Sequence, residues 1–473
     1  MTTPSSSNGA GGTNGTAAAP FRVGPVLASA VSTMATILLT ALVGVRFATH
    51  PSPRSRDGAL LDPRTMKKLA RASVTCFLPA IIFTNLAKNM DAGALSELWI
   101  LPAVAVLHNI IGVAVGRALL CLFDASCLPK AWRIPHFFRN PFLVGTMFGN
   151  SSQLPLVVGY ALCAQRPLSL LGFELAWRRY LAGNFIYLIG WNLLFWSVGN
   201  AILSSFADDD EVGGDDMTST SRDVELVVAE GKVGHDVVPL TTTTPTKTTT
   251  MKSTTTITTT TRGAAACAAA KKLLNMPNFA TIMGIGIGLI PGARQVIFEE
   301  GGELQFVGSA IELLAQPAVA MATIIVAGSL GRQAWVIANN RRERLAEQNR
   351  NKLAELAEPK ASSGSAAPMG AALGWRPALL FAVSRVIVVG SLNFVATAIV
   401  LRSSDVGRAI GAPEKILLLV ECFTPSANLV VVVSQQVGNS KGAAALSMGY
   451  LIQYGLFFPM LLLGSTLSVW IIS

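Results

Sequence analysis

Charged side chains are scarce in this chain of 473 residues. Asp, Glu, Lys and Arg make up 14% of it, whereas soluble domains average about 25%. Hydrophobic residues reach 51%, so the composition predicts a protein with several membrane-spanning segments rather than one large soluble core. The net charge of +10 then fits cytosolic loops that collect Lys and Arg better than it fits binding to nucleic acid.

Motifs for catalysis and for metal binding are also missing. The six cysteines form no Cys-x-x-Cys pair, and no P-loop, nucleophile elbow or metal motif occurs. We therefore expect no enzyme, no metal, no cofactor and no ATP-driven transport. The glycine run "GIGIGLIPG" at 284–292 superficially resembles a dinucleotide-binding loop. It lies in an apolar segment without a preceding strand, so we interpret it as a surface for close helix packing.

Long apolar runs, by contrast, are frequent, and ten of them reach the roughly 20 residues that a spanning helix needs. Five are expected in the first half, near 24–46, 67–88, 96–120, 142–164 and 178–203. Five more are expected in the second half, near 273–292, 306–330, 377–401, 414–437 and 443–472.

Three stretches outside these runs have the composition of linkers. Residues 1–23 predict a disordered tail, and the acidic and threonine-rich residues 204–272 predict a disordered loop. Residues 333–375 predict an insertion that begins as a solvated helix continuing the seventh span.

The loops that follow odd-numbered spans carry most of the basic residues. Examples are Arg54 and Arg56, Lys130 and Arg133, and the arginines at 341, 342 and 344. By the positive-inside rule these loops, with 204–272 and 333–375, are cytosolic. Both termini, and the tail 1–23, then lie on the other side of the membrane.

Two sets of five spans can share one fold only if they insert with opposite orientation. The sequence therefore predicts an all-α fold of ten transmembrane helices in two inverted repeats, 24–203 and 273–473, as in many secondary transporters. Corresponding spans carry matching prolines. Pro79 corresponds to Pro317, and Pro155 corresponds to Pro425.

The fourth and ninth spans combine a proline with a group of polar residues. Proline removes a backbone donor, and freed backbone groups within a membrane are tolerated only beside protein or a water-lined cavity. Broken helices there offer helix ends and neutral amides to a ligand. We therefore expect a central substrate site formed by two sets of residues: Asn150, Ser151, Gln153 and Pro155, and Thr424, Pro425 and Asn428.

Several other polar residues lie inside predicted spans, and each has two interpretations. Glu421 either exchanges protons or pairs with a neighbour such as Arg385, and Arg385 either holds a substrate carboxylate or a structural carbonyl. Asn109 and Tyr180 either line the cavity or make interhelical hydrogen bonds. The same holds for Asn184, Asn192 and Asn393, whereas His108 is interpreted as a core histidine.

Motifs in both halves resemble the PIN-LIKES proteins of the auxin efflux carrier family. The first half contributes "FLPAIIFTNLA" and "GNSSQLPLVVGYALC", and the second "NMPNFATIMGIGIGLIPGAR", "AIELLAQPAVAMATIIVAGSLG" and "ECFTPSANLVVVVSQQVG". The resemblance implies a ten-helix fold related to sodium/proton antiporters, with spans 4 and 9 crossing at their broken centres. This chain departs from the family pattern at Gln153 and Thr424, which bears on the substrate.

The resemblance also implies a function. It implies a secondary carrier of small amphipathic organic acid anions such as the auxin indole-3-acetate, in the endoplasmic reticulum membrane, with the plasma membrane as the alternative. Spans 3–5 and 8–10 would move against spans 1, 2, 6 and 7, which also offer a surface for a homodimer. Two alternatives stay open. One is a carrier of another organic anion coupled to protons or sodium, and the other is a membrane sensor or scaffold acting through its cytosolic loops.

Overall fold

The computed structural model describes residues 63–90, 92–124, 129, 132–151, 153–164, 168–205, 275–357 and 375–472, with positions 39, 42, 43 and 46. Within these ranges the secondary structure is helical, and strand-like pairing is limited to an isolated bridge between Gly149 and Ser426. The predicted tail 1–23, the predicted first span 24–46 apart from positions 39, 42, 43 and 46, and the predicted loop 204–272 beyond Ser205 lie outside the described residues.

The first half of the described chain contains helices that begin at Pro63. They are α2 (Pro63–Ala72), the π-helix η1 (Ser73–Phe77), α3 (Leu78–Asn89), α4 (Ala92–Leu98), α5 (Ile100–Asp124), α6 (His136–Met147), α7 (Gln153–Cys163), the 3-10 helix η3 (Leu168–Leu171), α8 (Phe173–Leu194), the π-helix η4 (Phe195–Gly199) and α9 (Asn200–Ser204).

The second half begins at Met276 and has the same helical character. Its helices are α12 (Met276–Leu289), α13 (Pro291–Phe298), α14 (Gln305–Ala315), α15 (Pro317–Ala357), α16 (Trp375–Val383), the π-helix η5 (Ser384–Val389), α17 (Gly390–Ser403), α18 (Asp405–Ala409), α19 (Ala412–Glu421), α20 (Asn428–Gln436) and α21 (Ser440–Ile472).

Among the described residues, five helical stretches are long and apolar enough to cross a membrane. They are Arg64–Asn89, Leu95–Phe123, Phe173–Ser204, Gln305–Arg332 and Trp375–Ser403. Helices α12 and α13, bent by 106° between Leu289 and Pro291, make a sixth if the pair is taken as one span. The predicted spans 142–164 and 414–437 are each divided into two short helices, α6 with α7 and α19 with α20, whereas α21 covers the predicted span 443–472.

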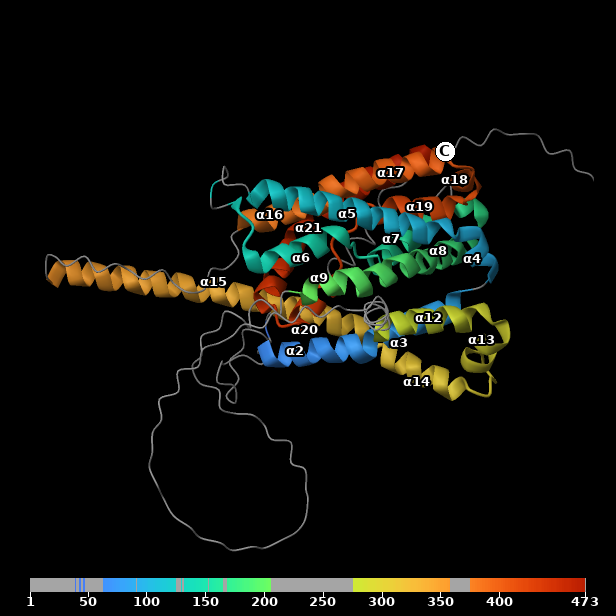
Figure 1. Ribbon diagram of the computed structural model, residues 1–473, viewed down its shortest axis with the longest axis horizontal. Helices are drawn as coiled ribbons and strands as arrows, with labels where there is room; N and C mark the ends of the chain where they lie inside the picture. Colours follow the sequence, from blue (N-terminus) through green and yellow to red (C-terminus); the bar gives the residue numbers. More distant parts are fainter. Residues whose placement is uncertain are drawn as a thin grey trace, which may run out of the picture.

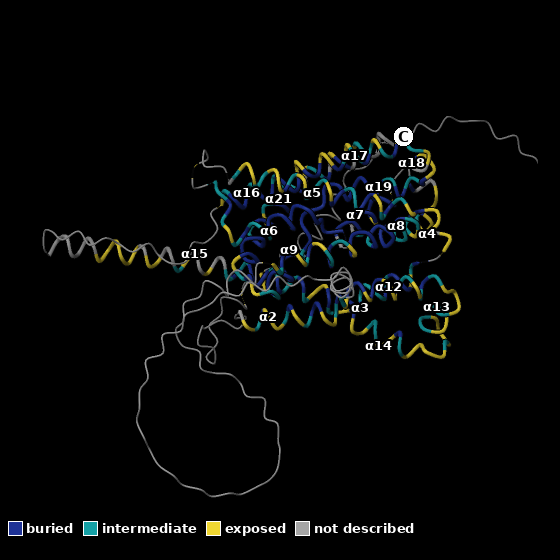
Figure 2. Tube along the Cα trace, viewed as in Figure 1, coloured by how far each residue is buried: buried dark blue, intermediate teal, exposed yellow. Residues whose placement is uncertain are grey.

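The helices form two layers, which lie one above the other in Figure 1. One layer contains α2, α3, α12, α13 and α14 with the first part of α15, and the other contains α5 to α9 and α16 to α19. Helix α21 packs against α6, α16 and α19 of the second layer and along α15 of the first, and α20 packs against both α2 and α6, so these two helices join the layers. Buried residues gather within the second layer and along its boundary with the first (Figure 2).

The glycine run of α12 packs closely against α3, as the sequence predicts. A Cβ built at Gly284 would lie 2.9 Å from Cβ of Leu86, and one at Gly288 would lie 2.7 Å from Cβ of Met90. Only hydrogen fits at these two positions, because the backbones approach as they do in other membrane helix pairs with small residues at the contact. Gly286, between them, has nothing within 4 Å of its Cβ position.

Helix α15 is a single helix of 41 residues, and it extends well beyond the body of the protein (Figure 1). At 1.5 Å per residue it is about 60 Å long. Its first turns contribute buried Ala318, Ala322 and Ile325, whereas Leu345 on the extension is exposed. The sequence prediction that a solvated helix continues the seventh span is therefore confirmed.

Candidate substrate site

Two helix breaks meet at the centre of the second layer. Helix α6 ends at Met147 and α7 begins at Gln153, while α19 ends at Glu421 and α20 begins at Asn428. The two connecting segments run antiparallel, with Gly149 opposite Ser426. The backbone N–H of Asn150 donates to the carbonyl of Pro425 at 2.6 Å, and the backbone N–H of Ala427 donates to the carbonyl of Phe148 at 3.0 Å.

The prolines do not have equivalent places in these breaks. Pro425 lies within the segment between α19 and α20, whereas Pro155 is the third residue of α7. A proline in the first turn of a helix costs little, because its missing N–H would have no partner in the helix. The sequence analysis expected Pro155 to be part of the break. In the structure Pro155 lies just after the break, in the first turn of α7.

Side chains from η5 and from the opposite break bind backbone carbonyls at the ends of the broken helices. The Arg385 guanidinium donates from Nε to the carbonyl of Thr424 and from Nη1 to that of Thr146, both at 3.1 Å. Ser426 donates to the carbonyl of Gly145 at 2.6 Å. Because an unpaired backbone group is costly within a membrane, these donors make the breaks possible.

Further donors come from α8 and α21. Trp191 donates from Nε1 to the carbonyl of Gly149 at 3.1 Å, and Tyr450 donates its hydroxyl to the carbonyl of Ala427 at 2.5 Å. The side chain of Gln453 binds Ser426 twice. Its Oε1 accepts from the backbone N–H of Ser426 at 2.8 Å, and its Nε2 donates to the Ser426 hydroxyl at 3.0 Å. The crossing is thus held by side chains from several elements around it.

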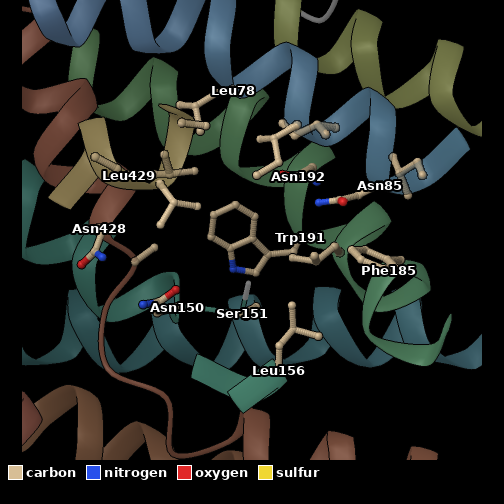
Figure 3. Close-up of a pocket in the computed structure, with 18 residues that line it drawn as sticks. Leu78, Asn85, Asn150, Ser151, Leu156, Phe185, Trp191, Asn192, Asn428 and Leu429 are labelled. Atoms are coloured by element: carbon tan, nitrogen blue, oxygen red, sulfur yellow. The ribbon is translucent and has the colours of Figure 1, made fainter. Parts of the chain in front are cut away.

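A cavity of about 210 Å³ lies beside the crossing, between the two layers (Figure 3). The described residues of its walls are mainly apolar, and none of them carries a charged side chain. The lining comprises Leu78, Ile81, Ile82, Asn85 and Leu86 of α3, Asn150 and Ser151 of the first break, Leu156 of α7, Phe185, Leu188, Trp191 and Asn192 of α8, Ala318, Val319 and Ala322 of α15, and Ala427, Asn428 and Leu429 at the second break.

The polar end of the cavity is formed by the two breaks. Asn150 and Asn428 lie on the same side of the Trp191 indole in Figure 3. The hydroxyl of Tyr454 is 3.5 Å from Nδ2 of Asn150 and also faces Asn428. Oδ1 of Asn428 has no hydrogen-bond partner among the described atoms. Helices α7 and α20 both begin here, and the first N–H groups of a helix favour an anion.

The indole of Trp191 forms an aromatic wall. It stacks on Phe195 with ring centroids 4.9 Å apart and planes 9° apart, and Phe148 meets it edge-on at 5.4 Å. The hydrogen bond to Gly149 fixes its nitrogen. A side chain held on three sides presents a rigid flat surface, and such surfaces bind aromatic or long apolar groups well.

Of the residues predicted to bind substrate, Asn150, Ser151 and Asn428 line the cavity, whereas Pro155, Thr424 and Pro425 are absent from its described lining. Thr424 is fully buried and donates its hydroxyl to the carbonyl of Glu421 at 2.9 Å. Pro425 uses its carbonyl in the crossing. Gln153 begins α7, and its side chain lies outside the described part of the structure.

Tyr180 and Asn109, which were interpreted either as cavity residues or as hydrogen-bonding residues, lie outside the cavity. The Tyr180 hydroxyl donates to the carbonyl of Pro155 at 2.9 Å, so it stabilises the start of α7. Asn109 donates to the carbonyl of Ala105 in its own helix at 2.8 Å. The second interpretation is correct for Tyr180, whereas the Asn109 bond stays within one helix.

The two charged candidates also lie outside the cavity. Arg385 binds carbonyl groups, which is the structural role that the sequence analysis left open. Glu421 is 1% exposed and makes no ion pair with Arg385, and neither of its carboxyl oxygens has a hydrogen-bond partner among the described atoms. Of the two interpretations of Glu421, direct pairing with Arg385 is therefore not observed.

The remaining polar residues of the spans divide into three groups. Asn192 lines the cavity. His108 is a satisfied core residue, with Nε2 2.7 Å from the Thr397 hydroxyl and Nδ1 3.0 Å from the Tyr187 hydroxyl. Asn184 and Asn393 are fully buried, and neither amide has a partner among the described atoms.

Sequence reasoning missed Trp191, Asn85 and Tyr454. Asn85 had a signal, since it is an amide inside the apolar run "FLPAIIFTNLA". Trp191 stands beside Asn192, which was a candidate. Tyr454 had no comparable signal, because aromatic residues are common in membrane spans, and only the crossing of the two breaks brings it to Asn150.

Comparison with known proteins identifies the family of the chain. The profile of a family described as membrane transport protein matches residues 30–454, which is most of the chain. The chain is also similar to Protein PIN-LIKES 2 of Arabidopsis thaliana, with 27% identity over 142 residues. That match covers 30% of this chain and 28% of the relative, so it spans less than a third of the relative's length.

Proposed function

The chain belongs to the membrane transport protein family, the auxin efflux carrier family that its motifs resemble, and from this premise we propose a secondary carrier of small amphipathic organic acid anions. The chain is an integral membrane transporter and not an enzyme. Indole-3-acetate is the substrate that the family resemblance favours. The carrier binds the anion beside the crossing and releases it by alternating access.

One observation carries this proposal: an uncharged, largely apolar cavity ends at two helix N-termini. Neutral amides and helix N-termini can hold a carboxylate without the cost of a permanent charge within the membrane. The substrate carboxylate would bind Asn150 and Asn428 at the start of α20, in the place where Tyr454 also reaches. Its ring or chain would lie on Trp191 and on the leucine and isoleucine side chains of α3.

The position of the cavity between the layers supports alternating access. Helices α3 and α15 contribute one wall, and the crossing with α8 contributes the other. Displacement of one layer against the other would open the cavity to one side of the membrane and then to the opposite side. We place the moving part in α5 to α9 and α16 to α21, and the scaffold in α2, α3 and α12 to α15.

The finer features of the family belong to the same proposal. They are ten spans in two inverted repeats, a cytosolic location of the insertion 333–375, a homodimer formed through the scaffold, and residence in the endoplasmic reticulum. The two broken spans occupy corresponding places in the two halves, which supports the repeat. Residence in the endoplasmic reticulum rests on the family resemblance of the motifs alone.

The test uses the full chain, purified and reconstituted into liposomes. Radiolabelled indole-3-acetate should accumulate above protein-free liposomes, and excess unlabelled acid should compete with it. Calorimetric titration should show stronger binding of indole-3-acetate than of its neutral alcohol analogue, because only the acid offers a carboxylate to the two amides.

The variant Asn428→Asp sharpens the test, because it places a negative charge in the cavity at nearly constant volume. Binding of indole-3-acetate should weaken at least about tenfold, since 1.4 kcal/mol of repulsion suffices for that change. Asn349→Asp makes the same charge change on the exposed extension of α15 and should bind normally. Folded protein that neither binds nor moves any organic acid in a panel of carboxylates would refute the proposal.

A further inference from the structure

The carboxyl group of Glu421 is buried at the crossing without a hydrogen-bond partner. Glu421 is the last residue of α19 and is 1% exposed. Among the described atoms, neither of its oxygens accepts a hydrogen bond of normal geometry. The Ser151 hydroxyl faces it, and Ser151 lines the substrate cavity. One side chain therefore separates this carboxyl from the cavity.

The surroundings of Glu421 are polar on the side of α8. Tyr180, Asn184 and Tyr187 are spaced by four and three residues, so they share one face of that helix. Both tyrosines interact electrostatically with Glu421. Asn184 is fully buried, and neither of its amide atoms has a partner among the described atoms.

The other titratable and charged groups around Glu421 are already engaged. Arg385 of η5 donates to the carbonyls of Thr146 and Thr424 and makes no ion pair with Glu421. Cys422 donates to the carbonyl of Leu418 at 3.1 Å, and His108 binds the hydroxyls of Tyr187 and Thr397. None of them neutralises the carboxyl by direct contact.

An ionised carboxylate in this position would be unpaired inside the membrane. Such a charge is costly, and a buried carboxyl without a counter-ion normally becomes neutral by taking up a proton. A neutral carboxylic acid has one O–H to donate. The Ser151 hydroxyl, which is 3.4 Å from the carbonyl of Gly149, can accept from Glu421 while it donates to that carbonyl.

We propose that Glu421 is the proton-binding residue of the carrier and exchanges its proton with the cavity through the Ser151 hydroxyl. An organic anion in the cavity would repel an ionised Glu421, so the anion and the proton travel together. This inference rests on the proposed function and adds the coupling ion to it. The proton moves as H⁺ between the Glu421 carboxyl, Ser151 and water, and no other bond changes.

The first test is gradient-driven uptake by the full chain in liposomes. Uptake of radiolabelled indole-3-acetate, after subtraction of protein-free liposomes, should rise several-fold when the outside is made acidic. Glu421→Gln keeps the shape of the side chain but cannot ionise, so its uptake should be the same with and without the gradient. Glu174→Gln makes the same change at an exposed position of α8 and should keep the stimulation.

The outcomes separate the proposals. Stimulation that persists in a folded Glu421→Gln variant would overturn the coupling while the carrier function stands. Stimulation by a sodium gradient at equal pH, lost in Glu421→Gln, would also overturn it in favour of a sodium ion at this carboxyl. A folded wild-type protein that moves no organic acid would overturn the proposed function itself.

A second measurement detects the proton without any transport. The infrared difference spectrum between wild type and Glu421→Gln should contain the C=O band of a protonated carboxylic acid at neutral pH. Bands of an ionised carboxylate in its place would overturn the proposal. Thermal unfolding of both proteins in detergent shows that the variant is folded, so a missing band reports on Glu421 and not on misfolding.

Discussion

The guanidinium of Arg385 lies in the space where a side chain at Gly149 would begin. A Cβ built at Gly149 would be 2.1 Å from Nη2 of Arg385 and 2.3 Å from Oγ1 of Thr424. The two broken segments can therefore cross this closely only because residue 149 is a glycine. The close approach lets one arginine reach the carbonyls of both segments.

The variant Gly149→Ala should destabilise the protein. Arg385 must move and lose at least one of its hydrogen bonds, and overpacking of this kind costs about 1–3 kcal/mol. The melting temperature in detergent should fall. Gly286→Ala is the matched control, because nothing lies within 4 Å of its Cβ position on α12. An unchanged melting temperature for Gly149→Ala would show that the crossing is looser than described.

Replacing Arg385 by lysine should also reduce stability, although the charge is kept. The planar guanidinium donates to two carbonyls in different directions, and a single ammonium cannot reproduce that geometry. A buried carbonyl left without a donor costs about 1–3 kcal/mol. Arg117→Lys, at an exposed position of α5, should have no comparable effect. Equal melting temperatures for the two variants would contradict the structural role of Arg385.

Trp191 should determine the preference for aromatic acids. Trp191→Leu removes both the flat ring and the hydrogen bond to Gly149, whereas Trp191→Phe removes only the donor. Aromatic contacts contribute about 0.5–1.5 kcal/mol beyond area burial. Binding of indole-3-acetate should therefore weaken up to about tenfold in Trp191→Leu, with a smaller loss for an aliphatic acid. An equal loss for both acids in a binding titration would remove Trp191 from the recognition of the ring.

The ion pairs of Arg179 should differ in their effects on stability. Arg179 binds Glu414, whose side chain is fully buried, at 2.7 Å, and Glu97, which is 57% exposed, at 2.6 Å. Arg179→Met leaves Glu414 buried without its partner, which costs several kcal/mol in a fully buried site. Because Arg179 is 37% exposed and solvent screens its charge, we expect Arg179→Met to lower the free energy of unfolding by about 2–3 kcal/mol.

Two further variants check this explanation. Glu97→Gln should change the free energy of unfolding by less than about 1 kcal/mol, because exposed ion pairs contribute little. Adding Glu414→Gln to Arg179→Met should recover part of the lost stability, since the unpaired charge is then gone. A double variant no more stable than Arg179→Met would assign the loss to packing and not to charge.

The place of the site could be predicted from the sequence, because prolines and amides are conspicuous in apolar spans. The side-chain amides of Asn150 and Asn428 would lose their hydrogen bonds in lipid, so they were expected to face protein or a cavity. Their matching positions in the two halves indicated that they meet. The walls of the cavity could not be predicted in this way. A leucine on the outer surface and one that faces a cavity look the same in the sequence, as exposed Leu193 and cavity-lining Leu188 of α8 illustrate.

The roles of the buried polar residues also required the structure. Tyr180 and Arg385 were credible candidates for the cavity, yet both use their hydrogen bonds on backbone carbonyls. Which carbonyls need a donor depends on where the helices stop, and helix ends within an apolar run leave little trace in the sequence. The same uncertainty made Pro155 look like the break itself.

The pairing of Asn150 with Pro425 and of Phe148 with Ala427 has a consequence for biosynthesis. During translation the first break enters the membrane long before its partners exist. Its backbone groups must then be satisfied by water, by lipid headgroups or by the insertion machinery until the second half arrives. Neither half can complete this centre alone, so the substrate site exists only once the last helices have been made.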